Sequence, residues 1–154
     1  MRSRLIVLLV GFMLPGVALS QDGVIKDFST DHVEKFIKDV MKVDAKKTVQ
    51  GGITLFQTPD LYYDVALHGG PKKCLVFRYV YDKNNATPKT MNDWNLHAEN
   101  LTRAARVEGK TVLQATINLQ AGVSMDQLRK VYDAIQEEKK TFEKATEGGP
   151  QGGA

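Results

Sequence analysis

The stretch MNDWNLHAENLTRAARVEGKTVLQATINLQAGVS, residues 91–124, decides the fold of this chain. It begins around the only tryptophan, Trp94, which has Asn92 and Asn95 as near neighbours, and Thr90 is placed to cap a short helix there. Such a group of side chains suits an active site, a binding platform or a structural corner. The rest of the chain has to decide among these three interpretations.

Two strand patterns follow, at 101–108 and 111–119, and the glycine between them predicts a hairpin. The sequence leaves the register of this hairpin open. A two-residue turn places Ala104 beside Leu113, whereas a three-residue loop places Ala105 there, and a slip by one residue exchanges the two faces. The three-residue loop gives the more apolar face, so we expect that register.

The remaining elements follow from hydrophobic spacing and turn residues. Ser29 or Thr30 can cap a first helix, which should end near Val43 because the next seven residues, 44–50, are polar and Gly51-Gly52 follows. Alternating patterns predict strands at 53–57, 61–68 and 73–82, and a capping box predicts a long helix at 125–145. We therefore expect an α+β fold of order α-β-β-β-α-β-β-α, with helices covering one face of a five-stranded antiparallel sheet.

The two ends of the chain have different compositions from its middle. Arg2 and Arg4 precede an apolar run, and small residues end at Ser20, so residues 1–20 are interpreted as an export signal cut after Ser20. An uncleaved N-terminal anchor is the alternative. We expect a domain at 21–145, a disordered Gly-rich tail at 146–154, no transmembrane segment after signal removal, and a periplasmic or secreted location.

Composition argues against several classes of function. The formal charge of +3 falls to +1 when Arg2 and Arg4 are removed, so nucleic acid is not an expected partner. The single cysteine, Cys74, cannot form a disulfide within the domain, and no histidine has ligand-type neighbours at metal-binding spacing. Ser29 and Ser124 are better explained as helix caps than as nucleophiles. We therefore expect no enzyme, no cofactor and no metal.

The segments KKCLVFRYVYD and MNDWNLHAENLTRAARVEGKTVLQATINLQAGVSMDQL resemble the YbjN-domain family, the bacterial sensory-transduction regulators, whose fold is similar to that of type III secretion chaperones. The resemblance implies a fold signature and carries no catalytic motif. Many relatives have a cysteine where this chain has His68-Gly69, so a family disulfide is not expected here. The residues that match the family signature are Asn92, Trp94, Asn95, Arg103 and Gly122.

From this resemblance we expect a non-enzymatic, protein-binding or chaperone-like regulatory module that forms a homodimer and holds an unidentified partner protein. Its candidate binding surface is the polar face of the sheet, with Arg78, Arg106, Gln114, Thr116 and Asn118. The alternative is a small-ligand binder or hydrolase in a cleft beside Trp94. For that function Asn92, Asn95 and Arg103 would be the working groups.

Overall fold

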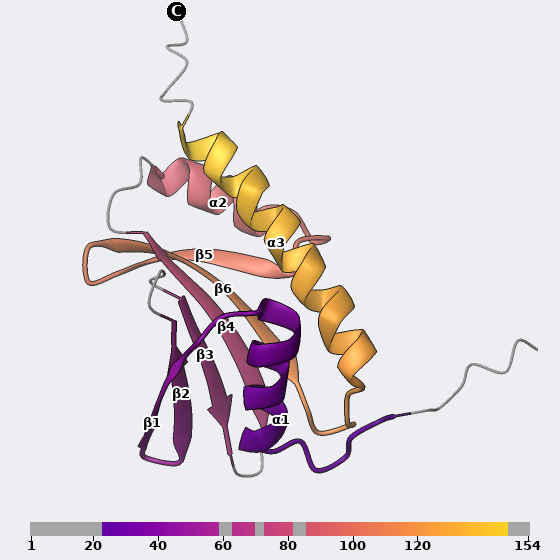
Figure 1. The fold of residues 1–154 in the computed structure, drawn as a ribbon. Coiled ribbons are helices and arrows are strands. Elements are labelled where there is room, and N and C mark those ends of the chain that lie inside the picture. The colour runs from indigo at the N-terminus through magenta and orange to yellow at the C-terminus, as the bar shows by residue number, and fades with distance from the viewer. Residues whose placement is uncertain (1–22, 59–62, 70–72, 82–85, 148–154) are drawn as a thin grey trace, which may run out of the picture.

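The computed structural model describes residues 23–58, 63–69, 73–81 and 86–147. It has an α+β fold with one six-stranded antiparallel sheet and three helices (Figure 1). The first helix continues into a short π-helical turn, η1. In chain order the elements are α1 (Thr30–Phe36), η1 (Ile37–Met41), β1 (Lys46–Gln50), β2 (Ile53–Gln57), β3 (Tyr63–His68), β4 (Cys74–Tyr81), α2 (Pro88–Leu96), β5 (Thr102–Val107), β6 (Lys110–Asn118) and α3 (Met125–Glu147).

The strands lie in the order β1-β2-β3-β4-β6-β5. Strands β1 to β4 form a meander, and the β5–β6 hairpin joins it through β6, so every neighbouring pair is antiparallel. As a result β4 and β6 lie inside the sheet, while β1 and β5 form its two edges.

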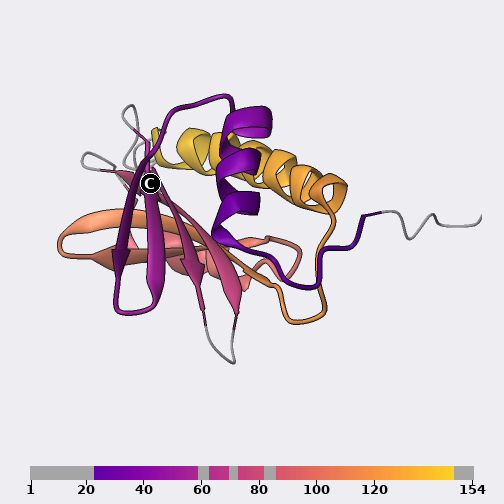
Figure 2. The ribbon, with the colours of Figure 1, turned by 60° about the horizontal axis from the view of Figure 1, so that its bottom comes forward.

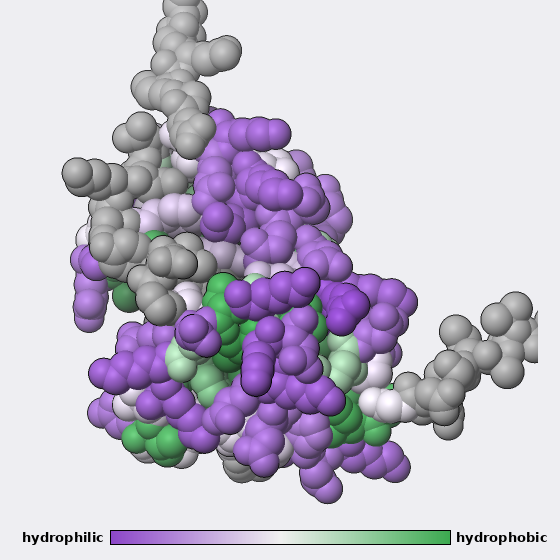
Figure 3. Space-filling model, in the orientation of Figure 1, coloured by the Kyte–Doolittle hydropathy of each residue, from purple (hydrophilic) through white to green (hydrophobic). Residues whose placement is uncertain are grey.

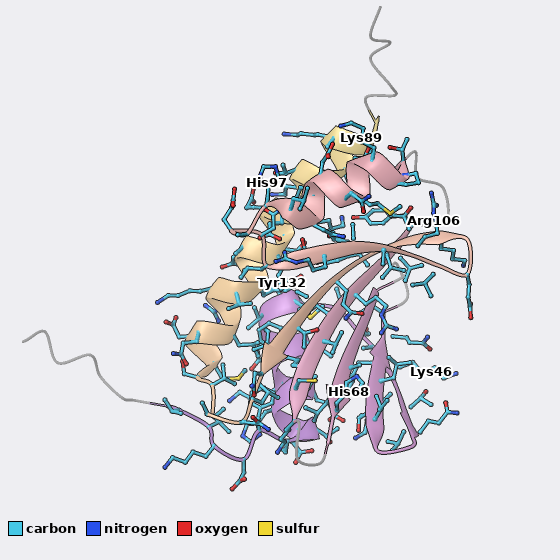
Figure 4. All side chains as sticks on the ribbon, turned by 180° about the vertical axis from the view of Figure 1, so that it is seen from behind. Lys46, His68, Lys89, His97, Arg106 and Tyr132 are labelled. Atoms are coloured by element: carbon cyan, nitrogen blue, oxygen red, sulfur yellow. The ribbon has the colours of Figure 1, made fainter. Side chains whose placement is uncertain are left out.

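Helices α1 and α3 pack on the same side of the sheet (Figure 2). Leu128, Ile135 and Phe142 recur every seven residues along α3 and are fully buried, which places one stripe of that helix on the sheet. The outer surface of α3 is almost entirely hydrophilic (Figure 3). From behind, strands β4 and β6 lie in front of α1 (Figure 4), and the face of the sheet on this side carries no helix among the described residues.

Aromatic side chains fill the space between the helices and the sheet. Phe77 on β4 and Phe36 on α1 are fully buried, with ring centroids 6.0 Å apart, and Tyr132 of α3 packs against both rings. Burial of Tyr132 raises the pKa of its hydroxyl. These contacts join the first and last helices to the same central strand.

The N-terminal segment pairs with the segment that follows β6, and Gly122 allows the two to approach each other closely. Ile25 and Val123 exchange two backbone hydrogen bonds, of 3.0 and 3.2 Å. Gly122 has a φ of +82°, and a Cβ at this position would lie 2.8 Å from Cγ1 of Val24. Glycine is therefore required both for the backbone conformation and for the close approach of the two segments.

Strand β1 is an element that the sequence analysis missed, so the expected order and the five-stranded sheet were each wrong by one strand. Gly51 and Gly52, with φ of +57° and +78°, form a two-residue hairpin turn between Gln50 and Ile53. All five residues of β1 are exposed, so the strand lacks the apolar alternation that would have identified it.

The expected register of the last hairpin was also wrong. Val107 pairs with Lys110 and Ala104 with Leu113, which is the two-residue turn. Both turn residues adopt a positive φ, +49° at Glu108 and +77° at Gly109. This left-handed conformation matches the right-handed twist of the flanking strands, but glutamate is an uncommon residue in it.

Two helix ends also differ from those expected. Thr87 caps α2, because its Oγ1 accepts a hydrogen bond of 3.1 Å from the Thr90 backbone N–H, so the cap lies before Pro88. The last helix continues through Thr146 and Glu147, which the sequence analysis assigned to the tail. The interpreted export signal at 1–20 and the rest of the tail lie outside the described residues. No described helix is both long enough and apolar enough to span a membrane.

Candidate functional site

The tryptophan side chain occupies a buried corner between α2, β5 and α3. Trp94 is 9% exposed, and its ring stands edge-on to Phe142 of α3, with centroids 5.2 Å apart. Its Nε1 donates a hydrogen bond of 3.2 Å to Oγ1 of the fully buried Thr102. The only tryptophan therefore fills a structural gap, and its polar atom is satisfied within that gap.

Glu138 of α3 completes this corner. Its carboxylate accepts hydrogen bonds from the backbone N–H groups of Leu101 and Thr102, at 2.7 and 2.8 Å, and from Thr102 Oγ1 at 2.6 Å. Thr102 thus accepts from Trp94 and donates to Glu138, and these hydrogen bonds link three elements. No local pattern marks Glu138, which lies 36 residues from Thr102 in the sequence.

Asn95 binds the free edge of β5. Its Nδ2 donates to the Ala104 carbonyl at 2.8 Å, and its Oδ1 accepts from the Ala104 N–H at 2.7 Å. The amide side chain therefore satisfies both backbone groups that a neighbouring strand would otherwise bind. Nearby, Asn100 Nδ2 donates to the Trp94 carbonyl at 3.1 Å, so its amide helps to end α2. The backbone φ of Asn100 itself is not positive.

The other residues of the expected signature do not join this corner. Asn92 is exposed on α2. Arg103 lies on the opposite side of β5, because successive residues of a strand face opposite ways, and its Nη1 donates to the carbonyls of Asn100 and Thr102 at 2.6 and 2.8 Å. Asn92, Asn95 and Arg103 therefore do not converge on one cleft beside Trp94.

A hollow with a volume of about 810 Å³ lies on the uncovered face of the sheet, which we call the open face. The twist of the sheet curves this face, and Val112 is only 5% exposed there although no described helix covers it. The hollow lies between the end of β2 and the β5–β6 turn. Its lining residues are Gln57, Thr58, Arg78, Val80, Arg103, Ala105, Val107, Glu108, Lys110, Val112 and Gln114.

Four of the five predicted surface residues lie on this open face. Arg78 of β4 is opposite Gln114 of β6, and its Nε is 3.4 Å from Gln114 Oε1. Thr116 and Asn118 follow at alternate positions along β6 and are exposed. The alternation of the two strands thus placed these four residues on one face of the sheet, as expected.

Arg106, the fifth predicted residue, lies on the other face, so its assignment was wrong. The two-residue turn pairs it with Thr111, a fully buried residue on the helix side. Its guanidinium donates to the carbonyls of Gly109 and Ala86, at 3.2 and 2.9 Å, and holds the hairpin against the segment before α2. Figure 4 shows Arg106 near the tip of this hairpin.

A second hollow, of about 410 Å³, lies further along the same two central strands. Cys74 of β4 lines it together with Thr116 and Asn118 of β6, and Lys73 and Gln120 stand at its end. The two hollows therefore follow β4 and β6 along the open face. Cys74 faces this surface and is half-buried.

Charged groups on the rim of the first hollow are mostly cationic. Arg78, Arg103 and Lys110 line it, against the single carboxylate of Glu108. On the covered face, burial raises the pKa of the Tyr81 hydroxyl well above its ordinary value, and the nearby Glu143 carboxylate adds to this shift. The lining of the first hollow therefore carries more cationic than anionic side chains.

Ser29 and His32 form the closest serine–histidine contact among the described hydrogen bonds, with Oγ and Nδ1 2.8 Å apart. The same Nδ1 accepts from the Ser29 backbone N–H at 3.1 Å, and the imidazole stacks on Phe28, with centroids 5.3 Å apart. This geometry is that of a helix cap. Within the described part of the chain, no three histidine, cysteine or acidic side chains gather as a metal site requires.

Comparison with known proteins finds neither a family model nor a curated protein that matches this chain.

Proposed function

We propose that this chain is an exported, non-enzymatic, YbjN-like module that binds a segment of a partner protein on its open sheet face, in a chaperone-like regulatory role. The observation that carries the proposal is the uncovered, hollowed face over β4 and β6, which combines an apolar floor with polar and cationic side chains. An extended polypeptide fits such a surface, because its alternating side chains can meet the alternating rows of a sheet.

This function is favoured over a ligand cleft beside Trp94 by the state of the corner residues. The Asn95 amide is occupied by the backbone of Ala104, and Trp94 is buried against Phe142. Substrate could reach these groups only if α2 moved away from β5. The open face needs no such rearrangement.

The proposal includes a homodimer, and the two parts can be tested in one experiment. A photo-crosslinking amino acid placed at Thr116, on the open face, is compared with the same amino acid at Asp133, on the exposed side of α3. Protein expressed from the full coding sequence in an exporting host is irradiated in the intact cells. We expect a crosslinked product from position 116 and none from position 133.

The mass and identity of that product then separate the outcomes. A second protein captured from position 116 supports partner binding on the open face, whereas a product of twice the chain mass places the dimer contact there. Light scattering of the purified protein measures the dimer independently, and a monomer at tens of micromolar would contradict that part. Crosslinks from position 133 alone, or from neither position, would contradict the binding surface.

A further inference from the structure

The open face orders its side chains in rows that cross three strands. Arg78 on β4 pairs with Gln114 on β6, and Gln114 pairs with Arg103 on β5, so one row reads arginine, glutamine, arginine. With about 4.8 Å between neighbouring strands, the two arginine Cα atoms are about 10 Å apart. This row therefore presents two guanidinium groups on either side of an amide.

The next row on the same face, two residues along each strand, is apolar. Val80 pairs with Val112, and Val112 pairs with Ala105. Both rows line the hollow of about 810 Å³. Because residues i and i+2 of a strand are about 6–7 Å apart, an extended segment running along β6 would meet the two rows with side chains two positions apart.

The arginines of the first row are held in position. Arg103 Nη1 donates to two backbone carbonyls, at 2.6 and 2.8 Å, which fixes its guanidinium at the rim. Arg78 is half-buried, and its Nε donates a hydrogen bond of 3.4 Å to Oε1 of Gln114. Guanidinium groups positioned in this way bind a carboxylate with less loss of side-chain freedom than lysines would.

We propose, as a deepening of the binding function above, that the segment held on this face is acidic, with an Asp or Glu two residues from an aliphatic or aromatic residue. The acidic side chain pairs with Arg78 and Arg103. The apolar side chain covers Val80 and Ala105. A neutral segment would desolvate the two arginines without a carboxylate to offset their positive charge, and a nucleic-acid backbone would leave the apolar row uncovered.

The length of the surface sets the length of the segment. Strand β6 has nine residues, from Lys110 to Asn118, and the two hollows lie along it. At about 3.3 Å per residue the strand spans roughly 30 Å, so a segment of about nine extended residues covers both hollows.

The inference is tested by selecting binders from a library of random 12-residue peptides displayed on phage, with protein expressed from the full coding sequence as the bait. We expect selected peptides to share an Asp or Glu two positions from an aliphatic or aromatic residue. A fluorescein-labelled peptide of this kind should bind the double variant Arg78→Gln/Arg103→Gln at least about tenfold more weakly than the wild type. Asp→Asn or Glu→Gln in the peptide should give a similar loss.

Two further variants sharpen the result. Arg78→Glu/Arg103→Glu should reverse the selection, so that Lys or Arg replaces the acidic residue in the peptides. Arg129→Glu reverses one charge on the exposed side of α3, which is half of the charge change in the double variant, and should leave both selection and affinity unchanged. Circular dichroism and urea unfolding establish that each variant is folded before it is used.

The outcomes distinguish this inference from the function on which it rests. Peptides with no acidic preference, binding that is insensitive to the arginine substitutions, or no selected peptide at all would overturn the inference. A partner crosslinked from position 116 would still support binding on the open face in each of these cases. If position 116 also gives no crosslink, the proposed function is contradicted as well.

Discussion

Replacing Trp94 tests the corner from which the fold was first deduced. Trp94→Ala removes a side chain that is 9% exposed, a ring contact with Phe142 and a hydrogen bond to Thr102. The lost hydrogen bond contributes about 0.5–1.5 kcal/mol and the aromatic pair a similar amount. Together with the transfer and cavity terms, the free energy of unfolding should fall by about 3–5 kcal/mol.

The hydrogen bond can be separated from the packing. Trp94→Phe keeps an aromatic ring near Phe142 but removes the Nε1 donor, and we expect a loss of about 1–2 kcal/mol. A double-mutant cycle with Thr102→Val isolates the coupling between the two side chains, because the loss of the contact between Thr102 and Glu138 is common to both arms. The expected coupling is about 1 kcal/mol.

Urea unfolding followed by far-UV circular dichroism is the appropriate assay. Fluorescence is unsuitable because Trp94 is the only tryptophan in the chain. The slope of unfolding free energy against urea should be unchanged, which shows that the folded state stays compact. If Trp94→Ala unfolds within about 1 kcal/mol of the wild type with that slope unchanged, Trp94 does not hold the corner together.

Three other substitutions give separate tests. Gly122→Ala should lower the free energy of unfolding by about 1–3 kcal/mol, because the residue has a φ of +82° and a Cβ would lie 2.8 Å from a valine methyl carbon. The control is Gly69→Ala, where φ is not positive, and it should lower the same free energy by less than about 1 kcal/mol in the urea assay. Tyr81→Phe should change stability at pH 7 by less than about 1 kcal/mol, because the buried hydroxyl has no hydrogen-bond partner among the described residues. Burial keeps this hydroxyl protonated in the folded protein above pH 10.0, where the unfolded chain loses the proton, so wild-type stability should fall more steeply than that of the variant as the pH rises further. Asn95→Ala should lower the free energy of unfolding by about 1–3 kcal/mol and remove hydrogen-exchange protection from the Ala104 amide. Retained protection would show that the Asn95 side chain does not shield the backbone of β5.

Helices and strands with an apolar stripe could be predicted from the sequence, because burial of that stripe is what stabilises them in the fold. The last helix is an example, since Leu128, Ile135 and Phe142 are all fully buried at the expected spacing. Strand β1 has no such stripe. It is held by backbone pairing with β2 and by an ion pair of 2.6 Å between Lys47 and Glu34 of α1, and neither contact leaves a local pattern in the sequence.

The residues of the candidate site also divide into those that local sequence spacing predicts and those that it does not. Alternation along β4 and β6 placed Arg78 and Gln114 on one face, because within a strand the side-chain period is fixed. Arg106 was misplaced since its face depends on the hairpin register, and that register is set by the positive φ of Glu108, which glutamate seldom adopts. The bonds of Glu138 to β5 depend on how α3 crosses the sheet, which sequence spacing alone does not determine.

The state of the two sheet edges is the reason that we propose recognition on the open face. At β5, Asn95 occupies the N–H and carbonyl of Ala104, and Glu138 occupies the N–H of Thr102, so an incoming strand would have to displace both side chains. At β1, Lys46 and Lys47 place charge on an exposed edge, a feature that discourages pairing with another strand. The corner around Trp94 therefore supports the proposed recognition function indirectly: because it closes the β5 edge, the face over β4 and β6 is the surface that we propose a partner segment covers.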